Sequence, residues 1–193
     1  MPRPRSEAVH RSVLDSALEL LEHEGYGRLT MEGIAQRAGA SKQTLYRWWP
    51  SPAAVLMESL SERASALVPD EDRGSLMLDL RTFVRRTVAG LREGAAPLVA
   101  GLMAQAQLDR RFGAAFRQQF LSRRRRALRA VLERARDRGE VAVGADLDLL
   151  VDIGFGTIWY RVLSQHAPLS RHFADHLTHA LLTLCSTAPR TRA

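Results

Sequence analysis

Cysteine, long apolar runs and lysine are all scarce in this sequence. Cys185 is the only cysteine, so no disulfide can form within the chain, which suits a reducing cytoplasm. We expect this thiol to be buried on the last helix, because free cysteine usually is; a redox-sensing thiol is the alternative. The longest apolar stretches, near residues 95–106 and 153–163, are short and interrupted. We therefore expect no membrane-spanning helix and no secretory signal.

Catalytic motifs are also missing. The sequence contains no nucleophile–base pair, no glycine-rich phosphate loop and no HExxH pattern, so we expect no enzymatic activity, no cofactor and no metal site. The length of 193 residues, with 46% hydrophobic and 25% charged residues, is typical of a globular protein with one core or two small ones. Helical periodicity recurs without strand-length alternation, which predicts an all-α protein of about nine helices.

The net charge of +7 is unevenly distributed. Residues 1–70 hold 8 Lys and Arg against 9 Asp and Glu, which leaves a charge of −1. Residues 110–138 hold 11 Arg against Glu133 and Asp137, a surplus of +9. Bulk charge therefore does not mark the N-terminal region as a nucleic-acid-binding domain, and any such function there must depend on the position of individual charges.

Residues 29–51, with the sequence LTMEGIAQRAGASKQTLYRWWPS, predict two short helices joined by a tight turn. Thr30 is a favourable N-cap for the first helix, and Gly39 can adopt the left-handed conformation that ends it. Ser41 then caps the second helix. Leu45 and Trp49 lie four residues apart on that helix and are expected to pack inward.

The opposite face of the second helix carries residue types that contact DNA. Lys42 and Tyr46 can reach phosphates, and Gln43 can form paired hydrogen bonds with an adenine edge. A capped helix N-terminus adds free N–H groups and a partial positive charge. The predicted DNA-binding residues are Thr30, Ser41, Lys42, Gln43, Thr44, Tyr46, Arg47 and Trp48.

This segment strongly resembles the TetR-type transcriptional regulators. Their DNA-binding pattern is matched in order and spacing at Leu29, Thr30, Ile34, Ala35, Ala38, Gly39, Ala40, Ser41, Thr44, Leu45, Tyr46, Trp48 and Trp49. The match covers about residues 8–60. The resemblance implies a three-helix helix-turn-helix DNA-binding domain over residues 1–50 and a ligand-binding and dimerisation domain over residues 51–193, entered through a connecting helix at 51–67.

One position departs from the family pattern. The resemblance leads us to expect a lysine after Ser51 that contacts a phosphate, but this chain has Pro52. Proline fits the first position of a helix, so the fold is unaffected. The phosphate contact is lost, and DNA binding is then either weaker or more dependent on Arg47 and on Arg3 and Arg5.

The C-terminal region predicts helices over 75–92, 95–107, 109–138, 146–165 and 170–186. Residues 147–163 are apolar nearly all round, which indicates burial on more than one side, against the protein's own core and against a second subunit. The resemblance likewise implies a homodimer formed through the last two helices. A dimer presents two recognition helices about 34–36 Å apart, which matches successive major grooves of a near-palindromic operator.

TetR-like proteins bind small effectors in this helical region. Ordinary core packing explains most of the bulky side chains there. The candidate effector-binding residues among them are Phe83, Met103, Phe116, Phe120, Phe155, Trp159 and Tyr160. The effector itself is not identified.

Two further clusters have alternative interpretations. Arg123 to Arg126 sweep about 300° around a helix, so at least one must approach the core or an interface. One interpretation is an arginine that binds an anion in an effector pocket, or that belongs to a second DNA-binding surface. The other, which we favour, is a solvated set of arginines in which one pairs with a carboxylate such as Asp109, Asp148 or Asp152. His172, His176 and His179 fall at helical spacing, but we favour a polar helix edge over a metal site.

We therefore expect a cytoplasmic, dimeric, ligand-responsive regulator that binds double-stranded DNA as a repressor and is released by a small-molecule effector. The resemblance implies that the effector shifts the connecting helix and changes the spacing of the recognition helices. The alternative is a helical small-molecule-binding protein with weakened or non-specific DNA binding. Repression and activation are not distinguished by the sequence, nor is the operator.

Overall fold

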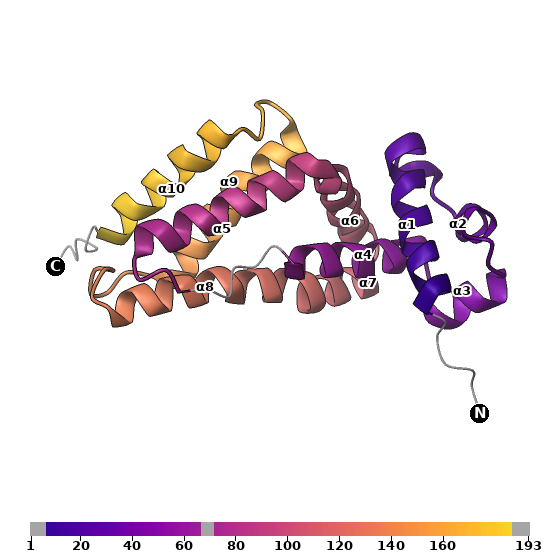
Figure 1. Cartoon of the computed structure of the whole chain (residues 1–193), viewed down its shortest axis with the longest axis horizontal. Helices are drawn as coiled ribbons and strands as arrows, with labels where there is room; N and C mark the ends of the chain where they lie inside the picture. Colours follow the sequence, from indigo (N-terminus) through magenta and orange to yellow (C-terminus); the bar gives the residue numbers. More distant parts are fainter. Residues whose placement is uncertain (1–6, 67–71, 187–193) are drawn as a thin grey trace. The chain divides into compact units, whose positions relative to one another are not determined.

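The computed structural model describes residues 7–66 and 72–186, except for the side chains of residues 63–66. The regular secondary structure of these residues is entirely helical, as predicted (Figure 1). The α-helices are α1 Glu7–Glu24, α2 Met31–Ala38, α3 Lys42–Trp48, α4 Pro52–Ala66, α5 Leu76–Gly90, α6 Ala96–Leu108, α7 Arg110–Phe116, α8 Ser122–Asp137, α9 Leu147–Ser164 and α10 Arg171–Ser186. A short 3-10 helix, η1 Tyr26–Arg28, precedes α2. No described helix is long and apolar enough to cross a membrane.

Two π-helical stretches, η2 Leu91–Ala95 and η3 Arg117–Leu121, make α5 continuous with α6 and α7 continuous with α8. The predicted single helix over 109–138 is therefore divided into α7, η3 and α8, which gives ten α-helices among the described residues where about nine were expected. The helix starts follow local chemistry. Ser75, Asp109 and Asp146 accept hydrogen bonds from backbone N–H groups in the first turns of α5, α7 and α9.

The chain separates into two compact units, Met1–Ser65 with Gly94–Phe120, and Ala66–Glu93 with Leu121–Ala193. We call them the N-terminal unit and the C-terminal unit. The chain passes between the units at the end of α4, within η2 and within η3. These units are defined by compactness, whereas the predicted boundary between residues 50 and 51 separates a DNA-binding from a ligand-binding domain. That functional boundary stays a prediction.

The N-terminal unit packs α2 against α1 and α3, and α6 against α1 and η1. Its core includes Val13, Ile34, Leu45 and Leu56, each fully buried. Tyr26 of η1 lies against Gly101 of α6, where a Cβ atom would come within 2.6 Å of the tyrosine ring. Glycine at position 101 therefore allows η1 to pack closely on α6. Burial of the tyrosine raises the pKa of Tyr26 to about 12.

The C-terminal unit packs α5 against α10 and α8, and α9 against α8 and α10. Leu80, Leu132, Val151 and Leu181 lie in its core. Cys185 is buried on α10 as predicted, and burial raises the pKa of its thiol to about 11. Arg85 donates two hydrogen bonds to Asp175, at 2.6 and 2.8 Å, and so joins α5 to α10.

Candidate nucleic-acid interface

The turn between α2 and α3 has the local structure that its sequence predicts. Thr30 caps α2 by accepting the Gly33 N–H at 3.0 Å, and Gly39 ends the helix with a φ of 64°. Ser41 caps α3 by accepting the Thr44 N–H at 3.2 Å. Because each cap satisfies a backbone donor at a helix start, the geometry of the turn is fixed by three residues close in sequence.

The two faces of α3 divide as expected. Leu45 and Trp49 are buried, at 0% and 2% exposure, whereas Lys42, Gln43 and Tyr46 point to solvent. Tyr46 is the most exposed aromatic residue of this segment, at 52%. The helix therefore presents a polar face that includes one cation, one amide and one phenol, all of which can contact phosphates or base edges.

The hydroxyl groups that are predicted to contact DNA form hydrogen bonds within the protein itself. The Ser41 and Thr44 hydroxyl groups lie 2.9 Å apart, in hydrogen-bonding distance, while Ser41 and Thr30 also accept backbone N–H groups. Their positions at the N-termini of α2 and α3 are those predicted from the sequence. Contact of these hydroxyls with DNA stays a prediction.

Lys42 has a partner that the sequence analysis missed. Its Nζ lies 2.5 Å from Glu32 Oε1, and both side chains are about half exposed. The hydrogen bond from Lys42 holds the pKa of Glu32 below its usual range. Glu32 is ten residues away on the preceding helix, so only the folded turn brings it next to the single lysine of the chain. A phosphate must compete with this carboxylate for Lys42.

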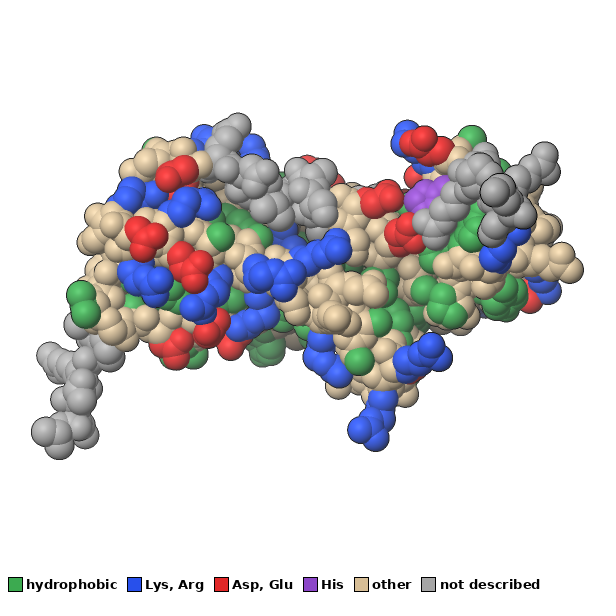
Figure 2. Space-filling model, turned by 90° about the horizontal axis from the view of Figure 1, so that it is seen from below, with side chains coloured by type: hydrophobic (Ala, Val, Ile, Leu, Met, Phe, Trp, Pro, Cys, Tyr) green, Lys and Arg blue, Asp and Glu red, His purple; other side chains and the backbone are tan. Residues whose placement is uncertain are grey.

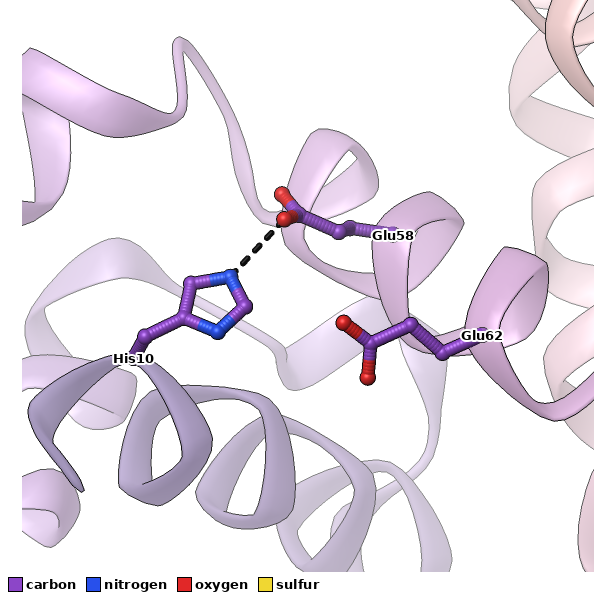
Figure 3. Close-up of side chains that lie close together, drawn as sticks. All are labelled: His10, Glu58 and Glu62. Carbon is purple, nitrogen blue, oxygen red and sulfur yellow. Dashed lines mark hydrogen bonds and ion pairs between the residues drawn. The ribbon is translucent and has the colours of Figure 1, made fainter. Parts of the chain in front are cut away.

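The C-terminal end of α3 is fastened by Trp49. Its backbone N–H bonds to Leu45 O at 2.8 Å, and its indole N–H donates to Glu58 Oε2 of α4 at 2.5 Å. The ring of His10 on α1 stacks on it with centroids 5.4 Å apart. The Glu58 carboxylate also lies 2.8 Å from His10 Nε2 (Figure 3). The Glu58 carboxylate thus connects the end of α3 to both α1 and α4.

The aromatic tip of α3 and the start of α4 complete this region. Trp48 is partly buried with its ring edge-on to Trp49 at 5.5 Å, and the Arg47 guanidinium lies 5.6 Å from the centre of the Trp48 ring. Pro52 is the first residue of α4, and Ser51 accepts the Ala54 N–H at 3.3 Å. Proline is therefore accommodated at the helix start, as expected.

The candidate effector residues fall into separate groups. Phe83, Phe155 and Trp159 lie together in the C-terminal unit. The ring centroids of Phe83 and Phe155 are 6.1 Å apart, and those of Phe155 and Trp159 are 5.3 Å apart. Met103, Phe116 and Phe120 belong to the N-terminal unit. Tyr160 is 64% exposed. These residues do not all line one site within either unit.

The four consecutive arginines have different environments. Arg124 is 5% exposed, which confirms the prediction that at least one of the four approaches the core. It donates a hydrogen bond to Thr87 Oγ1 at 2.6 Å, and its guanidinium lies over the rings of Phe83 and Phe155. Burial lowers its pKa to about 10. Arg125 instead pairs with Asp152 and Asp148. The predicted pairing with a carboxylate is thus also present.

Other arginines of the 110–138 segment are held by carboxylates of the C-terminal unit. Arg129 pairs with Asp148 and Glu133, and Arg138 with Asp72, Asp79 and Glu140. On the face shown in Figure 2, cationic and anionic side chains are intermingled over this unit, at the left of the view. Four arginines of this segment, Arg125, Arg129, Arg134 and Arg138, therefore form ion pairs within the C-terminal unit.

The histidines of α10 are exposed, and the rings of His172 and His176 lie 3.9 Å apart. Among residues 7–66 and 72–186, these histidines do not assemble with a third metal-ligating side chain. The group that does assemble is His10, Glu58 and Glu62, which the sequence analysis missed because His10 is 48 residues from Glu58.

Comparisons with known proteins agree with this geometry. Residues 13–58 match the family model of bacterial regulatory proteins of the tetR family, and residues 70–181 match the tetracyclin repressor-like C-terminal domain. The regulator YdeS of Bacillus subtilis is 33% identical over 161 residues, covering 83% of this chain and 81% of YdeS. A DNA-binding transcriptional repressor, TetR of Mycobacteroides abscessus, is 30% identical over 183 residues, covering 92% of this chain and 94% of the relative.

Among solved structures, the TetR family transcription regulator SCO0332 superposes with a TM-score of 0.75 at 30% identity, covering 94% of this chain and 99% of that protein. Two domain matches, full-length relatives and a shared fold all agree with the capped helix-turn-helix described above. This chain belongs to the TetR family of DNA-binding transcriptional regulators.

Proposed function

We propose that this regulator is a repressor that binds a near-palindromic operator as a homodimer and is released by a small-molecule effector. The observation that carries the proposal is the polar face of α3, where Lys42, Gln43 and Tyr46 project from a doubly capped turn. A repressor among the full-length relatives supports the direction of regulation.

The proposed DNA contacts follow from residue chemistry and position. Gln43 reads a base edge through its amide, because it is exposed in the first turn of the recognition helix. Lys42, Tyr46 and Arg47 contact phosphates and fix the position of the helix in the groove. Thr30, Ser41, Thr44 and Trp48 add contacts from the helix starts and the aromatic tip. Pro52 supplies no charge, so the binding of phosphates depends on these groups and on Arg3 and Arg5, which lie outside the described residues.

The proposed dimer interface is an apolar stripe on α9. Its buried side carries Val151, Phe155 and Ile158, whereas Leu149, Tyr160 and Leu163 are 55%, 64% and 51% exposed. The exposed positions, together with Gly156, recur at helical spacing along one face. Such a stripe is costly to leave in water, and a second copy of the chain, related by a two-fold axis, covers it in the proposed dimer.

The dimer is tested by Leu163→Glu, which places a charge in the proposed interface. Sedimentation velocity should show a dimer for the unaltered protein and a monomer for this variant. Leu108→Glu is the matched control, because Leu108 is 84% exposed on a different helix and should tolerate the charge. A monomeric unaltered protein, or a dimer that survives the substitution, contradicts the proposed interface.

The proposed effector site surrounds Phe83, Phe155 and Trp159, with Arg124 and Thr87 as polar groups. Aromatic rings beside a guanidinium suit an apolar molecule that carries an anionic group. Once a compound that releases DNA is found, Phe155→Ala should abolish its effect while the variant still binds the operator. Phe116→Ala, in the other unit, should retain the response; a loss of response only in Phe116→Ala contradicts this site.

Operator binding is tested by selecting genomic DNA fragments with the purified protein. Enrichment of fragments that share a near-palindromic motif supports the proposed function. Salt-sensitive binding without a shared motif supports instead a small-molecule-binding protein with non-specific DNA affinity. Repression is then tested by placing the selected motif between a promoter and a reporter gene, where the protein should lower expression.

A further inference from the structure

His10, Glu58 and Glu62 converge from two helices onto one point (Figure 3). His10 projects from α1, and the two glutamates lie one turn apart on α4. One ligand atom of each residue lies within 4.8 Å of the ligand atoms of the other two. An imidazole nitrogen and two carboxylate oxygens in this arrangement are donors that a transition-metal ion binds.

Two of the three donors are already held in position. Glu58 uses Oε2 to accept the Trp49 indole N–H, while its Oε1 is turned toward His10 Nε2 at 2.8 Å. The His10 ring is stacked on the buried Trp49 ring. A hydrogen bond that orients a ligating carboxylate and a contact that fixes an imidazole are the outer-shell features that preorganise metal sites.

Glu62 supplies an additional charge beside this pair. Its carboxylate faces the His10 ring in Figure 3, and it makes no hydrogen bond or ion pair with any other residue that the structure describes. Two carboxylates that face one imidazole bring negative charge together at the site, which a divalent cation would neutralise. The exposed position of Glu62 also leaves the site open to solvent, so an ion can enter and water can complete its coordination.

We propose that His10, Glu58 and Glu62 bind a divalent first-row transition-metal ion of the Zn²⁺ type. Ligand bonds of about 2.0–2.2 Å place the donor atoms roughly 3.4 Å apart in a tetrahedral site. The His10–Glu58 pair therefore opens slightly, and Glu62 moves inward by side-chain rotation. Mg²⁺ and Ca²⁺ are disfavoured, because they take six or more ligands that are mostly oxygen atoms, including water.

The bound ion would tie α4 to α1 next to Trp49, which ends the recognition helix. Metal occupancy would thus fix the end of α3 relative to α1 and change operator affinity. This regulatory role rests on the proposed DNA-binding function, whereas metal binding itself does not. The two are therefore measured separately, and failure of one is distinguishable from failure of the other.

The test is a titration of the tag-free, full-length protein with Zn²⁺ by calorimetry and with Co²⁺ by visible absorption, in the absence of DNA. We expect one ion per chain, no comparable binding of Mg²⁺, and d–d bands typical of tetrahedral Co²⁺. Glu62→Gln should weaken binding by more than about tenfold, a loss that even removal of an outer-shell partner produces. His10→Gln should do the same, with circular dichroism confirming that the variant is folded.

Two controls separate this site from others on the chain. Glu24→Gln removes the same charge from an exposed glutamate of α1 and should leave Zn²⁺ affinity unchanged. The double variant His172→Ala and His176→Ala removes the histidine pair of α10 and should also bind one ion. Absence of Zn²⁺ binding by the unaltered protein, or binding that survives both Glu62→Gln and His10→Gln, overturns the proposal.

Discussion

Residues 30–49 and residues 117–138 differ in the use of their charged side chains. The first segment has only three cationic residues, Arg37, Lys42 and Arg47, and exposes the last two on the recognition helix. The second is rich in arginine, yet Arg124 is buried and Arg125, Arg129 and Arg138 pair with carboxylates of the same unit. On the proposed DNA-binding helix, positive charge is therefore sparse and exposed, whereas in the second segment Arg125, Arg129 and Arg138 form ion pairs within the C-terminal unit.

The largest predicted effect concerns the stability of the C-terminal unit. Arg138→Ala should lower the free energy of unfolding by about 2 kcal/mol, because it leaves the buried Asp79 carboxylate without its cationic partner. Urea denaturation measures the change. Arg123→Ala on the same helix is the control, since Arg123 is exposed and should change stability by less than about 0.5 kcal/mol. Equal effects of the two substitutions would remove the distinction between structural and surface arginines.

Lys42→Ala tests the opposite kind of charge. It should reduce operator affinity by roughly tenfold near 0.1 M salt and lower the slope of log affinity against log salt by about one, as expected for the loss of one phosphate contact. Thermal stability should be nearly unchanged, because the side chain is half exposed. Binding curves at several salt concentrations give the slope; an unaltered slope would show that Lys42 does not touch a phosphate.

Glu32→Gln refines the comparison within the helix-turn-helix. Removing the carboxylate frees Lys42 from its ion pair and removes a negative charge near the DNA, so affinity should rise by roughly threefold. Fluorescence anisotropy with an operator fragment measures this. Glu19→Gln removes a similar charge that pairs with Arg37 instead, and should have the smaller effect. A fall in affinity for Glu32→Gln would mean that the ion pair positions Lys42 for binding.

The smallest effect concerns the pH dependence of the Arg85–Asp175 pair. The hydrogen bond from Arg85 lowers the pKa of Asp175, so the pair stabilises the folded state above the ordinary aspartate pKa of about 3.9 and loses this effect as the pH falls through the lowered value. The Tm of Asp175→Asn should thus lie slightly below that of the unaltered protein above about pH 5. The difference should shrink below about pH 4; a constant difference would contradict this coupling.

The features that sequence predicted are those set by neighbouring residues. The caps at Thr30, Gly39 and Ser41 depend on bonds within three or four positions, and the burial of Leu45 and Trp49 follows from helical periodicity. The end of α1 at Glu24 is likewise set locally, because Gly25, with a φ of 79°, follows the last turn.

The missed features depend on contacts between distant residues or on unusual helix geometry. Glu32 meets Lys42 only across the folded turn, and His10 meets Glu58 only after α4 packs near α1. The spacing of Glu58 and Glu62 was visible in the sequence but gave no indication of a third donor. The π-helical stretch η3 was also missed. A single wider turn hardly changes the spacing of apolar residues, so the periodicity predicts one uninterrupted helix.

The central claim is that a few positioned side chains on α3 read a specific operator. The most direct measurement compares the binding motif selected from random DNA by the unaltered protein and by Gln43→Ala. The proposed mechanism predicts a near-palindromic motif for the unaltered protein, and for the variant a motif that loses preference at one base pair in each half-site while the rest is retained. The absence of any motif for the unaltered protein, or identical motifs for both proteins, would contradict it.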